Sequence, residues 1–150
     1  MTDSVDQNER RTDKRLTPPC VLLVDDNSLA LVLMARNLKE LGCSILSAGN
    51  GQEALEILHA EPSVDLVVTD LGMPVMDGLE LLRQIRATET LKELPVIFCS
   101  GDVDEAMLEK ATAYGCTRYL VKPVHPEFLF EQIETILSHP DVPYLPPQPA

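Results

Sequence analysis

Short apolar runs alternate with helix-like segments along most of the chain, and this alternation restricts the possible folds more than any other feature of the sequence. The apolar runs are 21–24, 45–48, 64–69, 95–99 and 118–121. They are nearly continuous in hydrophobicity, which is typical of β-strands that are covered on both faces. Because a helix-like segment separates each run from the next, we predict an α/β fold with a parallel sheet and right-handed crossovers.

The segments between and after the strands carry recognisable helix signals. We predict helices at 29–41, 50–60, 79–86, 102–114 and 126–137. Gly42 is well placed to end the first helix, and Asn50 with Glu53 three residues later is a typical helix start. Either Asp102 or Asp104 can cap the fourth helix. Each predicted strand is therefore followed by one predicted helix.

The two ends of the chain differ in composition from the part between them. Residues 1–19 are polar and mixed in charge up to the Pro18–Pro19 pair, which predicts a disordered N-terminal arm. Residues 139–150 contain five prolines and predict a proline-rich tail or linker. The segment 20–138 holds every predicted strand and helix, and its length suffices for one compact domain with its own core.

The acidic balance of the chain excludes some classes of partner. The chain has 24 acidic residues and 12 basic ones, which gives a formal net charge of −12. Such a charge repels nucleic acids and anionic membrane surfaces, so we expect no direct contact with either. The sequence has no signal-peptide core and no apolar stretch of the ~20 residues that span a bilayer. Its four cysteines form no C-x-x-C pair, which predicts reduced, buried and inert thiols in a cytoplasmic protein.

Polar side chains stand where four of the predicted strands end. Asp25 and Asp26 follow the first strand, Asp70 follows the third, Ser100 follows the fourth and Lys122 follows the fifth. Each of these alone is ordinary turn or capping chemistry. Because ligands of open parallel sheets bind beyond the carboxyl ends of the strands, we expect the five side chains to converge on one rim.

Three carboxylates on one rim require a cation. At ~4 Å and an effective dielectric constant near 20, each like-charged pair costs about 4 kcal/mol. Lys122 offers one positive charge, and Mg²⁺ prefers carboxylate oxygens, with water completing its shell. A carboxylate beside Mg²⁺ can attack phosphorus to form an aspartyl phosphate, with Lys122 and Ser100 contacting the transferred oxygens. The ATP-binding motif G-x-x-x-x-G-K-[ST] is absent, so we expect the phosphoryl group to come from another donor.

The order and spacing of these motifs resemble those of a known family. The Asp25–Asp26 pair, the run TDLGMPVMDG that ends at Gly78, then Ser100 and the Lys122–Pro123 pair are similar to the motifs of bacterial two-component response-regulator receiver domains of the CheY type. The resemblance covers roughly residues 20–138. It implies a doubly wound, flavodoxin-like sheet of five parallel strands in the order 2-1-3-4-5.

The resemblance also implies a role for each residue of the rim. Asp70 matches the phosphoacceptor, and Asp25 and Asp26 match the acid pair that holds Mg²⁺ together with Asp70. Gly72 would offer its backbone carbonyl to the same ion, so its missing side chain does no harm there. Lys122 matches the lysine that binds the phosphoryl group.

The family resemblance further implies a switch and a cis peptide bond. Ser100 would move toward the phosphoryl group, and Tyr119, three residues before Lys122, would turn inward in response. The output surface would consist of the fourth helix, the fifth strand and the fifth helix. The Lys122–Pro123 bond would be cis.

The favoured function is a phosphorylation-activated signalling switch whose donor is a phosphohistidine on a histidine kinase or a histidine phosphotransfer protein. Its output would be a downstream protein target or a fused output domain, in a stand-alone receiver, a relay or a fragment of a larger regulator. It would catalyse only its own phosphorylation and dephosphorylation, so we do not class it as a metabolic enzyme.

The alternatives are an interaction module that has lost phosphorylation and a Mg²⁺-dependent phosphohydrolase with an aspartyl nucleophile. The second alternative requires a D-x-D motif at the first strand and a cap domain. This chain has neither that motif nor the length for such a domain.

The first predicted helix has an unusual apolar segment. Residues 28–35 read SLALVLMA and are apolar around nearly the whole helix, whereas a helix on a sheet can bury only one stripe. We therefore expect Leu29 and Val32 to form an exposed patch beside Asp70 where the phosphoryl donor docks. The alternative is that the N-terminal arm or a second molecule covers this patch.

Overall fold

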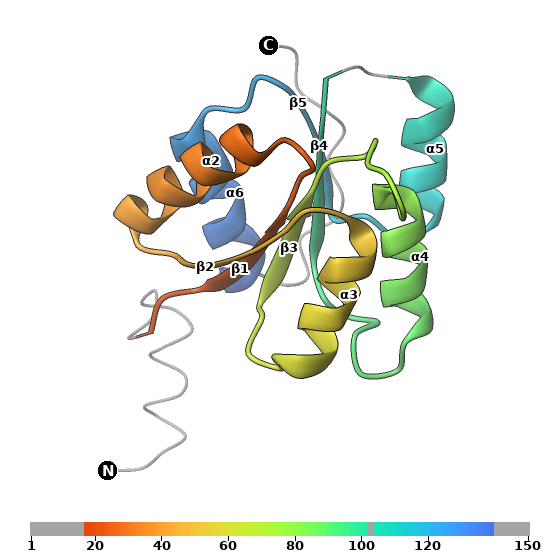
Figure 1. Ribbon diagram of the computed structural model, residues 1–150, viewed down its shortest axis with the longest axis horizontal. Helices are drawn as coiled ribbons and strands as arrows, with labels where there is room; N and C mark the ends of the chain where they lie inside the picture. The colour runs from red at the N-terminus through yellow and green to blue at the C-terminus, as the bar shows by residue number, and fades with distance from the viewer. Residues whose placement is uncertain (1–16, 102–103, 140–150) are drawn as a thin grey trace.

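The computed structural model describes residues 17–101 and 104–139 (Figure 1). Most of the predicted arm at 1–19 and of the predicted tail at 139–150 therefore lies outside the described residues. So does Asp102, one of the two candidate caps of the fourth helix. In the described ranges no helix is both long enough and apolar enough to cross a membrane.

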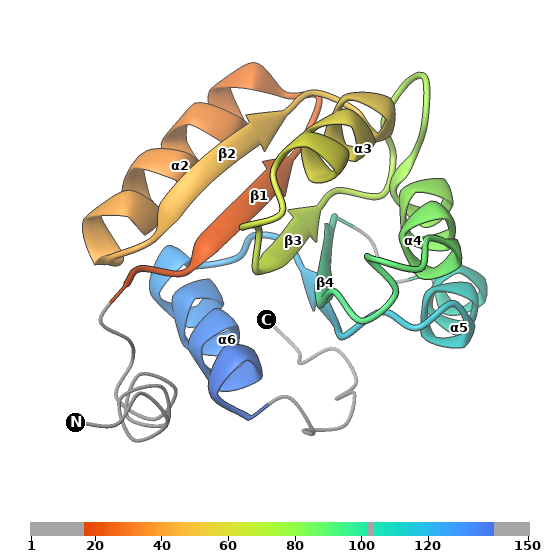
Figure 2. The same cartoon turned by 90° about the horizontal axis from the view of Figure 1, so that it is seen from below.

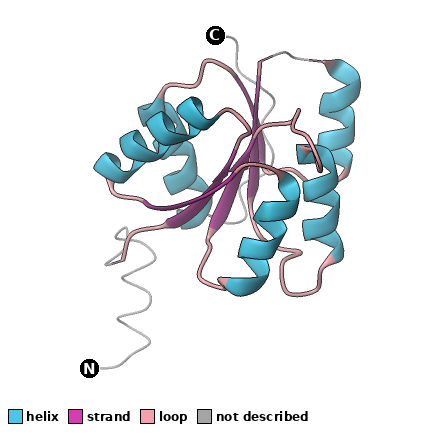
Figure 3. Cartoon of the chain, in the orientation of Figure 1, coloured by secondary structure: helices cyan, strands magenta, loops and turns pink. Residues whose placement is uncertain are grey.

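In the described residues, five strands form one parallel sheet in the order β2-β1-β3-β4-β5, which confirms the predicted fold class and strand order. Figure 3 shows the strands in magenta, with helices on both sides of them. The strands are β1 (Cys20–Val24), β2 (Ser44–Ala48), β3 (Leu66–Thr69), β4 (Val96–Ser100) and β5 (Arg118–Val121). The chain leaves β1 for β2 on one side and returns to β3 on the other. The sheet therefore changes direction at β1 and β3, and such a switch point opens a crevice at the carboxyl ends of the two strands.

Within residues 17–101 and 104–139, five helices cover the two faces of the sheet. They are α2 (Ser28–Leu41), α3 (Gly51–Ala60), α4 (Gly78–Ala87), α5 (Glu105–Ala113) and α6 (Pro126–Ser138). Helices α2 and α6 pack on one face, and α3, α4 and α5 pack on the other (Figure 2). Side chains alternate along β1, because Leu22 and Val24 join the core under α3–α5 while Val21 and Leu23 join the core under α2 and α6.

A side-chain cap begins each of the helices that the structure describes. The caps of α2, α3, α4 and α5 are Asn27, Asn50, Asp77 and Asp104, each of which accepts a hydrogen bond from a backbone N–H of the first turn. Asp104 is thus the residue that caps the fourth helix. The imidazole of His125 accepts from Glu127 N in the same way at the start of α6.

The third strand begins two residues later than predicted, at Leu66 rather than 64. The reason lies in Asp65, whose carboxylate accepts the backbone N–H of Cys20 at 2.8 Å while its own N–H donates to the Cys20 carbonyl. Asp65 therefore holds the start of β1 through its backbone and its carboxylate, and the pairing of β3 with β1 begins only at the next residue. Val64 is buried, which explains why the apolar run appeared to start there.

Candidate functional site

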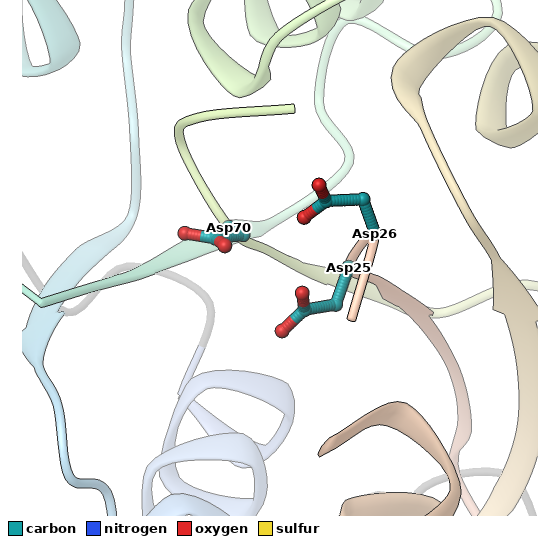
Figure 4. Close-up of side chains that lie close together, drawn as sticks. All are labelled: Asp25, Asp26 and Asp70. Atoms are coloured by element: carbon teal, nitrogen blue, oxygen red, sulfur yellow. The ribbon is translucent and has the colours of Figure 1, made fainter. Parts of the chain in front are cut away.

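Three carboxylates meet at the carboxyl ends of β1 and β3 (Figure 4). Asp25 and Asp26 directly follow β1, and Asp70 directly follows β3. These strands are neighbours in register, with Val24 opposite Thr69. Each carboxylate therefore offers one oxygen to a group whose members all lie within 4.8 Å of one another.

Backbone hydrogen bonds hold two of these acids in place. Asp25 N donates to Ala48 O of β2 at 3.1 Å, and Asp70 N donates to Val24 O of β1 at 3.0 Å. The Oδ1 atom of Asp25 accepts from Asn27 N, and the Oδ1 atom of Asp70 accepts from Leu71 N. The two Oδ2 atoms are the ones that face Lys122.

Lys122, which follows β5, reaches those two Oδ2 atoms along the same rim of the sheet. Its Nζ lies 3.5 Å from Asp25 Oδ2 and 3.4 Å from Asp70 Oδ2. The backbone of Lys122 is held at the end of β5 by its N–H, which donates to Ser100 O at 2.7 Å. Burial alone would lower the pKa of Lys122, but the charges of Asp70 and Asp25 outweigh it and raise the pKa. Lys122 is therefore a cation throughout the neutral pH range.

The charges of this site do not balance by themselves. Three carboxylates gather here, and Lys122 contributes one positive charge beside Asp25 and Asp70. Like charges at ~4 Å repel by about 4 kcal/mol at an effective dielectric constant of 20. All the donors are hard oxygen atoms, which are the ligands that Mg²⁺ prefers. Asp26 is exposed and Asp25 and Asp70 are only half-buried, so water can complete an ion's shell. The residues present thus fit a magnesium ion.

Ser100 and Tyr119 line one small cavity on the opposite side of the sheet from α2. Ser100 ends β4, and Tyr119 on β5 is fully buried with its ring edge-on to Phe98 at 6.1 Å between centroids. The cavity has a volume of about 240 Å³ and lies between the loop after β3 and the start of α5. The two proposed switch residues are therefore brought together, and Gly72 lines the same space.

The structure also gives the positions of the other residues that the sequence singled out, which are Gly72, Leu29, Val32 and Pro123. Gly72 stands two residues after Asp70 on the exposed loop to α4. Leu29 and Val32 lie on α2 with exposed fractions of 68% and 61%, so the described chain does not cover them. The Lys122–Pro123 peptide bond is cis, as expected from the resemblance.

Three of the four cysteines are buried as predicted, and all four are free thiols. The prediction was wrong for Cys20, which is half-buried because it begins the first strand beside the exposed Asp65. Burial raises the pKa of Cys99 and of Cys116 to about 12 in each case. Their thiols therefore stay protonated and unreactive at neutral pH.

The sequence did not reveal how closely the chain passes itself at Gly78. A Cβ atom at this position would collide with the backbone carbonyl oxygen of Asp70. Gly78 N also donates to Leu71 O at 2.8 Å, which closes the loop that follows the acid. Glycine is thus required here to hold Asp70 in position, and the Asp-Gly pair was its one visible signal.

Comparison with known proteins gives one consistent result. The profile of the "Response regulator receiver domain" family matches residues 21–134. A two-component response regulator of Oryza sativa subsp. indica, ORR11, is 36% identical over 109 residues, which cover 73% of this chain and 74% of that protein. The chemotaxis protein CheY1 of Helicobacter pylori is 35% identical over 122 residues, which cover 81% of this chain and 98% of that protein.

Solved structures agree with the sequence comparisons. The structure of the chemotaxis response regulator CheY4 of Vibrio cholerae has a TM-score of 0.74 and 28% identity, and covers 80% of this chain and 99% of its own. A response regulator receiver protein from Pseudomonas putida has a TM-score of 0.75 and 34% identity, and covers 79% of this chain and 98% of its own.

Proposed function

Since the chain belongs to the response regulator receiver domain family, we propose that Asp70 is its phosphoacceptor and that Asp25, Asp26, Lys122 and Ser100 serve the transfer. The chain is a signalling domain of the two-component type. The observation that carries the assignment is the geometry around Asp70. Its Oδ2 atom faces Lys122 at 3.4 Å, and it belongs to a carboxylate cluster less than 4.8 Å across.

Asp25, Asp26 and Asp70 would hold Mg²⁺, with the backbone carbonyl of Gly72 as a further ligand. The ion would supply positive charge to the oxygens of the transferred group. Lys122 would supply a second positive charge, because its Nζ lies 3.4 Å from Asp70 Oδ2. Ser100 is the last residue of β4, and its hydroxyl would donate a hydrogen bond to the same group.

The reaction itself is a simple displacement at phosphorus. An oxygen of the Asp70 carboxylate forms a bond to phosphorus while the nitrogen–phosphorus bond of a phosphohistidine donor breaks. The donor ring is protonated on its other nitrogen, so it takes the bonding electron pair and leaves as neutral imidazole. Catalysis then consists of positioning and charge stabilisation, which the fixed Asp70 and the cationic Lys122 provide. Hydrolysis of the aspartyl phosphate by water returns the carboxylate and inorganic phosphate.

The proposal is tested by incubating the protein with acetyl phosphate and measuring its intact mass. We expect one added phosphoryl group (~80 Da) only when Mg²⁺ is present. Chelation of the metal with EDTA is the matched control. A protein that stays unmodified with donor and metal together would favour the interaction module that has lost phosphorylation.

Mg²⁺ should also stabilise the folded protein without any donor. At a concentration of 100 times its dissociation constant, a ligand that binds only the folded state adds about 2.7 kcal/mol to the free energy of unfolding. We expect the melting temperature to rise by roughly 5 °C or more in a thermal unfolding scan. Na⁺ at matched ionic strength should not reproduce this rise. A rise of the same size in the Asp26→Asn variant would contradict the role of Asp26 as a ligand.

The phosphoryl signal would leave the site through Ser100 and Tyr119. These residues share the cavity between the loop after β3 and the start of α5, so a shift of Ser100 toward the phosphoryl group changes the space beside the Tyr119 ring. Tyr119 lies on β5, next to α5 along the chain. We therefore propose α5, β5 and α6 as the output surface, the equivalent of the predicted fourth helix, fifth strand and fifth helix. A difference of a few kcal/mol between two states would suffice to shift the population.

Leu29 and Val32 would receive the protein that carries the phosphohistidine, a histidine kinase or a histidine phosphotransfer protein. They begin α2, three and six residues after Asp26, and are exposed at 68% and 61%. Burial of one Leu or Val side chain contributes about 1.5–3 kcal/mol. Replacing both by glutamine should therefore slow transfer from the histidine donor at least roughly tenfold.

Labelling by acetyl phosphate should be unchanged in this double variant, because the small donor needs no docking surface. Tyr114→Gln is a suitable control, since Tyr114 is exposed at 37% but lies after the C-terminal end of α5. Equal losses with both donors would instead show that the double variant damages the phosphorylation site.

We also propose the division of the chain into an arm at 1–19, a receiver domain at 20–138 and a proline-rich tail or linker at 139–150. The close agreement between the strand and helix bounds and the matched range 21–134 supports it. The free thiols support a cytoplasmic location. A downstream protein target or a fused domain would read the output surface.

A further inference from the structure

A second, larger cavity opens directly beside the acidic site on the other side of the sheet. It has a volume of about 430 Å³ and lies between α2, α6 and the carboxyl ends of the strands. Leu23, Val68 and Cys99 from three adjacent strands line its inner end, and Asp25, Asp70 and Lys122 line its mouth. It therefore joins an apolar interior to a charged opening.

Two of the side chains that line the cavity are short. Ala30 lies on α2, and Val124 lies on the loop that leads to α6. Both are half-buried. The volume falls within the ~300–1,000 Å³ of typical small-molecule sites, which are mostly apolar with a few polar groups that fix orientation.

The charges at the mouth select the head group of a ligand. Asp25 and Asp70 line the opening, and an oxygen of Asp26 lies within 4.8 Å of theirs. Lys122 is the cation that faces Asp25 and Asp70, so the three carboxylates leave an excess of two negative charges. An ammonium group in this mouth would gain charge-assisted hydrogen bonds to the carboxylates, whereas a carboxylate head group would be repelled.

We propose that this cavity binds a small amphipathic cation, a primary amine that carries an apolar group about the size of an indole ring. The ring lies between α2 and α6, and the ammonium group lies against Asp25 and Asp70. The ligand and Mg²⁺ use the same carboxylates, so each weakens the binding of the other. The consequence for phosphorylation rests on the proposed function, whereas the binding itself does not.

Tryptamine is a suitable probe because the chain contains no tryptophan. Its indole fluorescence can be followed selectively, and we expect the emission to shift to shorter wavelength and saturate as the ring enters the apolar cavity. Indole-3-acetate carries the same ring with a negative charge and should bind at least tenfold more weakly in metal-free buffer. Equal binding of the two compounds would overturn the proposed role of the carboxylates.

Two variants fill the cavity from opposite sides. Val124→Phe and Ala30→Met should each weaken tryptamine binding at least tenfold, because the added side chain occupies the space of the ring. Leu33→Phe is the matched control, since Leu33 lies on α2 but does not line the cavity. Circular dichroism and thermal unfolding identify the variants that fold. Unchanged binding in a folded filling variant would overturn the proposal.

Competition with Mg²⁺ separates this proposal from the proposed function. The apparent dissociation constant of tryptamine should rise in proportion to Mg²⁺ concentration once the metal saturates the acids. Ca²⁺ should act in the same direction, whereas Na⁺ at equal ionic strength should not. Binding that is unaffected by Mg²⁺ would overturn the shared site. If Asp70 were never phosphorylated, the fluorescence titration would still decide whether the cavity binds the amine.

Discussion

Asp70→Asn is expected to abolish phosphorylation by acetyl phosphate while leaving the protein folded. The substitution keeps the shape of the side chain but removes the negative charge that attacks phosphorus. The amide oxygen can still accept the hydrogen bond that Leu71 N now donates to Asp70 Oδ1 at 2.8 Å. The intact mass of the variant should therefore show no added phosphoryl group under conditions that label the wild-type protein.

Asp77→Asn provides the matched control, with the same chemical change seven residues along the chain. Asp77 caps α4 by accepting from Glu80 N at 2.9 Å, and asparagine caps helices about as well as aspartate. We expect this variant to be labelled like the wild-type protein. Persistent labelling of Asp70→Asn would place the phosphoryl group on another residue and contradict the assignment of Asp70.

Gly78→Ala is expected to lower the free energy of unfolding. The substitution adds one methyl group at the first residue of α4, where the chain passes close to Asp70. The new Cβ would collide with the Asp70 carbonyl oxygen and lie 3.1 Å from the Leu71 Cα atom. These are backbone atoms, so no side-chain rotation can relieve the contact. Overpacking of this kind costs typically 1–3 kcal/mol and sometimes more. Urea denaturation should show a lower midpoint, and Mg²⁺-dependent labelling should fall because Asp70 is displaced.

Gly101→Ala is the control for this prediction. No atom of the described residues lies within 4 Å of a Cβ atom at Gly101, and its backbone is not in the left-handed region. Alanine there should leave stability unchanged or raise it by up to about 1 kcal/mol, because it reduces the freedom of the unfolded chain. Equal destabilisation by the two substitutions would show that the close approach at Gly78 is not the cause.

The sequence predicted the fold because its local patterns agree with the tertiary structure. The fifth strand was placed at 118–121, as observed, and the caps Asn50 and Asp104 were visible as helix starts. The third strand was predicted to start too early because Val64 is buried but is not paired with another strand. Asp65, the next residue, uses its carboxylate to accept the backbone N–H of Cys20. Hydrophobic patterns report burial, whereas strand bounds depend on the partner strand.

The convergence of the acids was also predictable, since parallel strands bring their carboxyl ends to one rim. The distances between these side chains could not be predicted, because they depend on contacts between residues far apart in the chain. Lys122 lies 97 residues from Asp25 along the chain, and their contact at 3.5 Å requires the register of β5 on β4. The sequence placed each charge at a strand end but could not show which oxygens face the lysine.

By itself, the sequence determined the order of strands and helices, the residue types at the strand ends and the family that uses them. These features follow from local periodicity and from motifs that can be read along one dimension. Only the tertiary structure decided that Gly78 passes against the Asp70 carbonyl and that a cavity of about 430 Å³ opens between α2 and α6. Both depend on how packed elements fill space, and the volume left between distant side chains is not encoded in the pattern of any single segment.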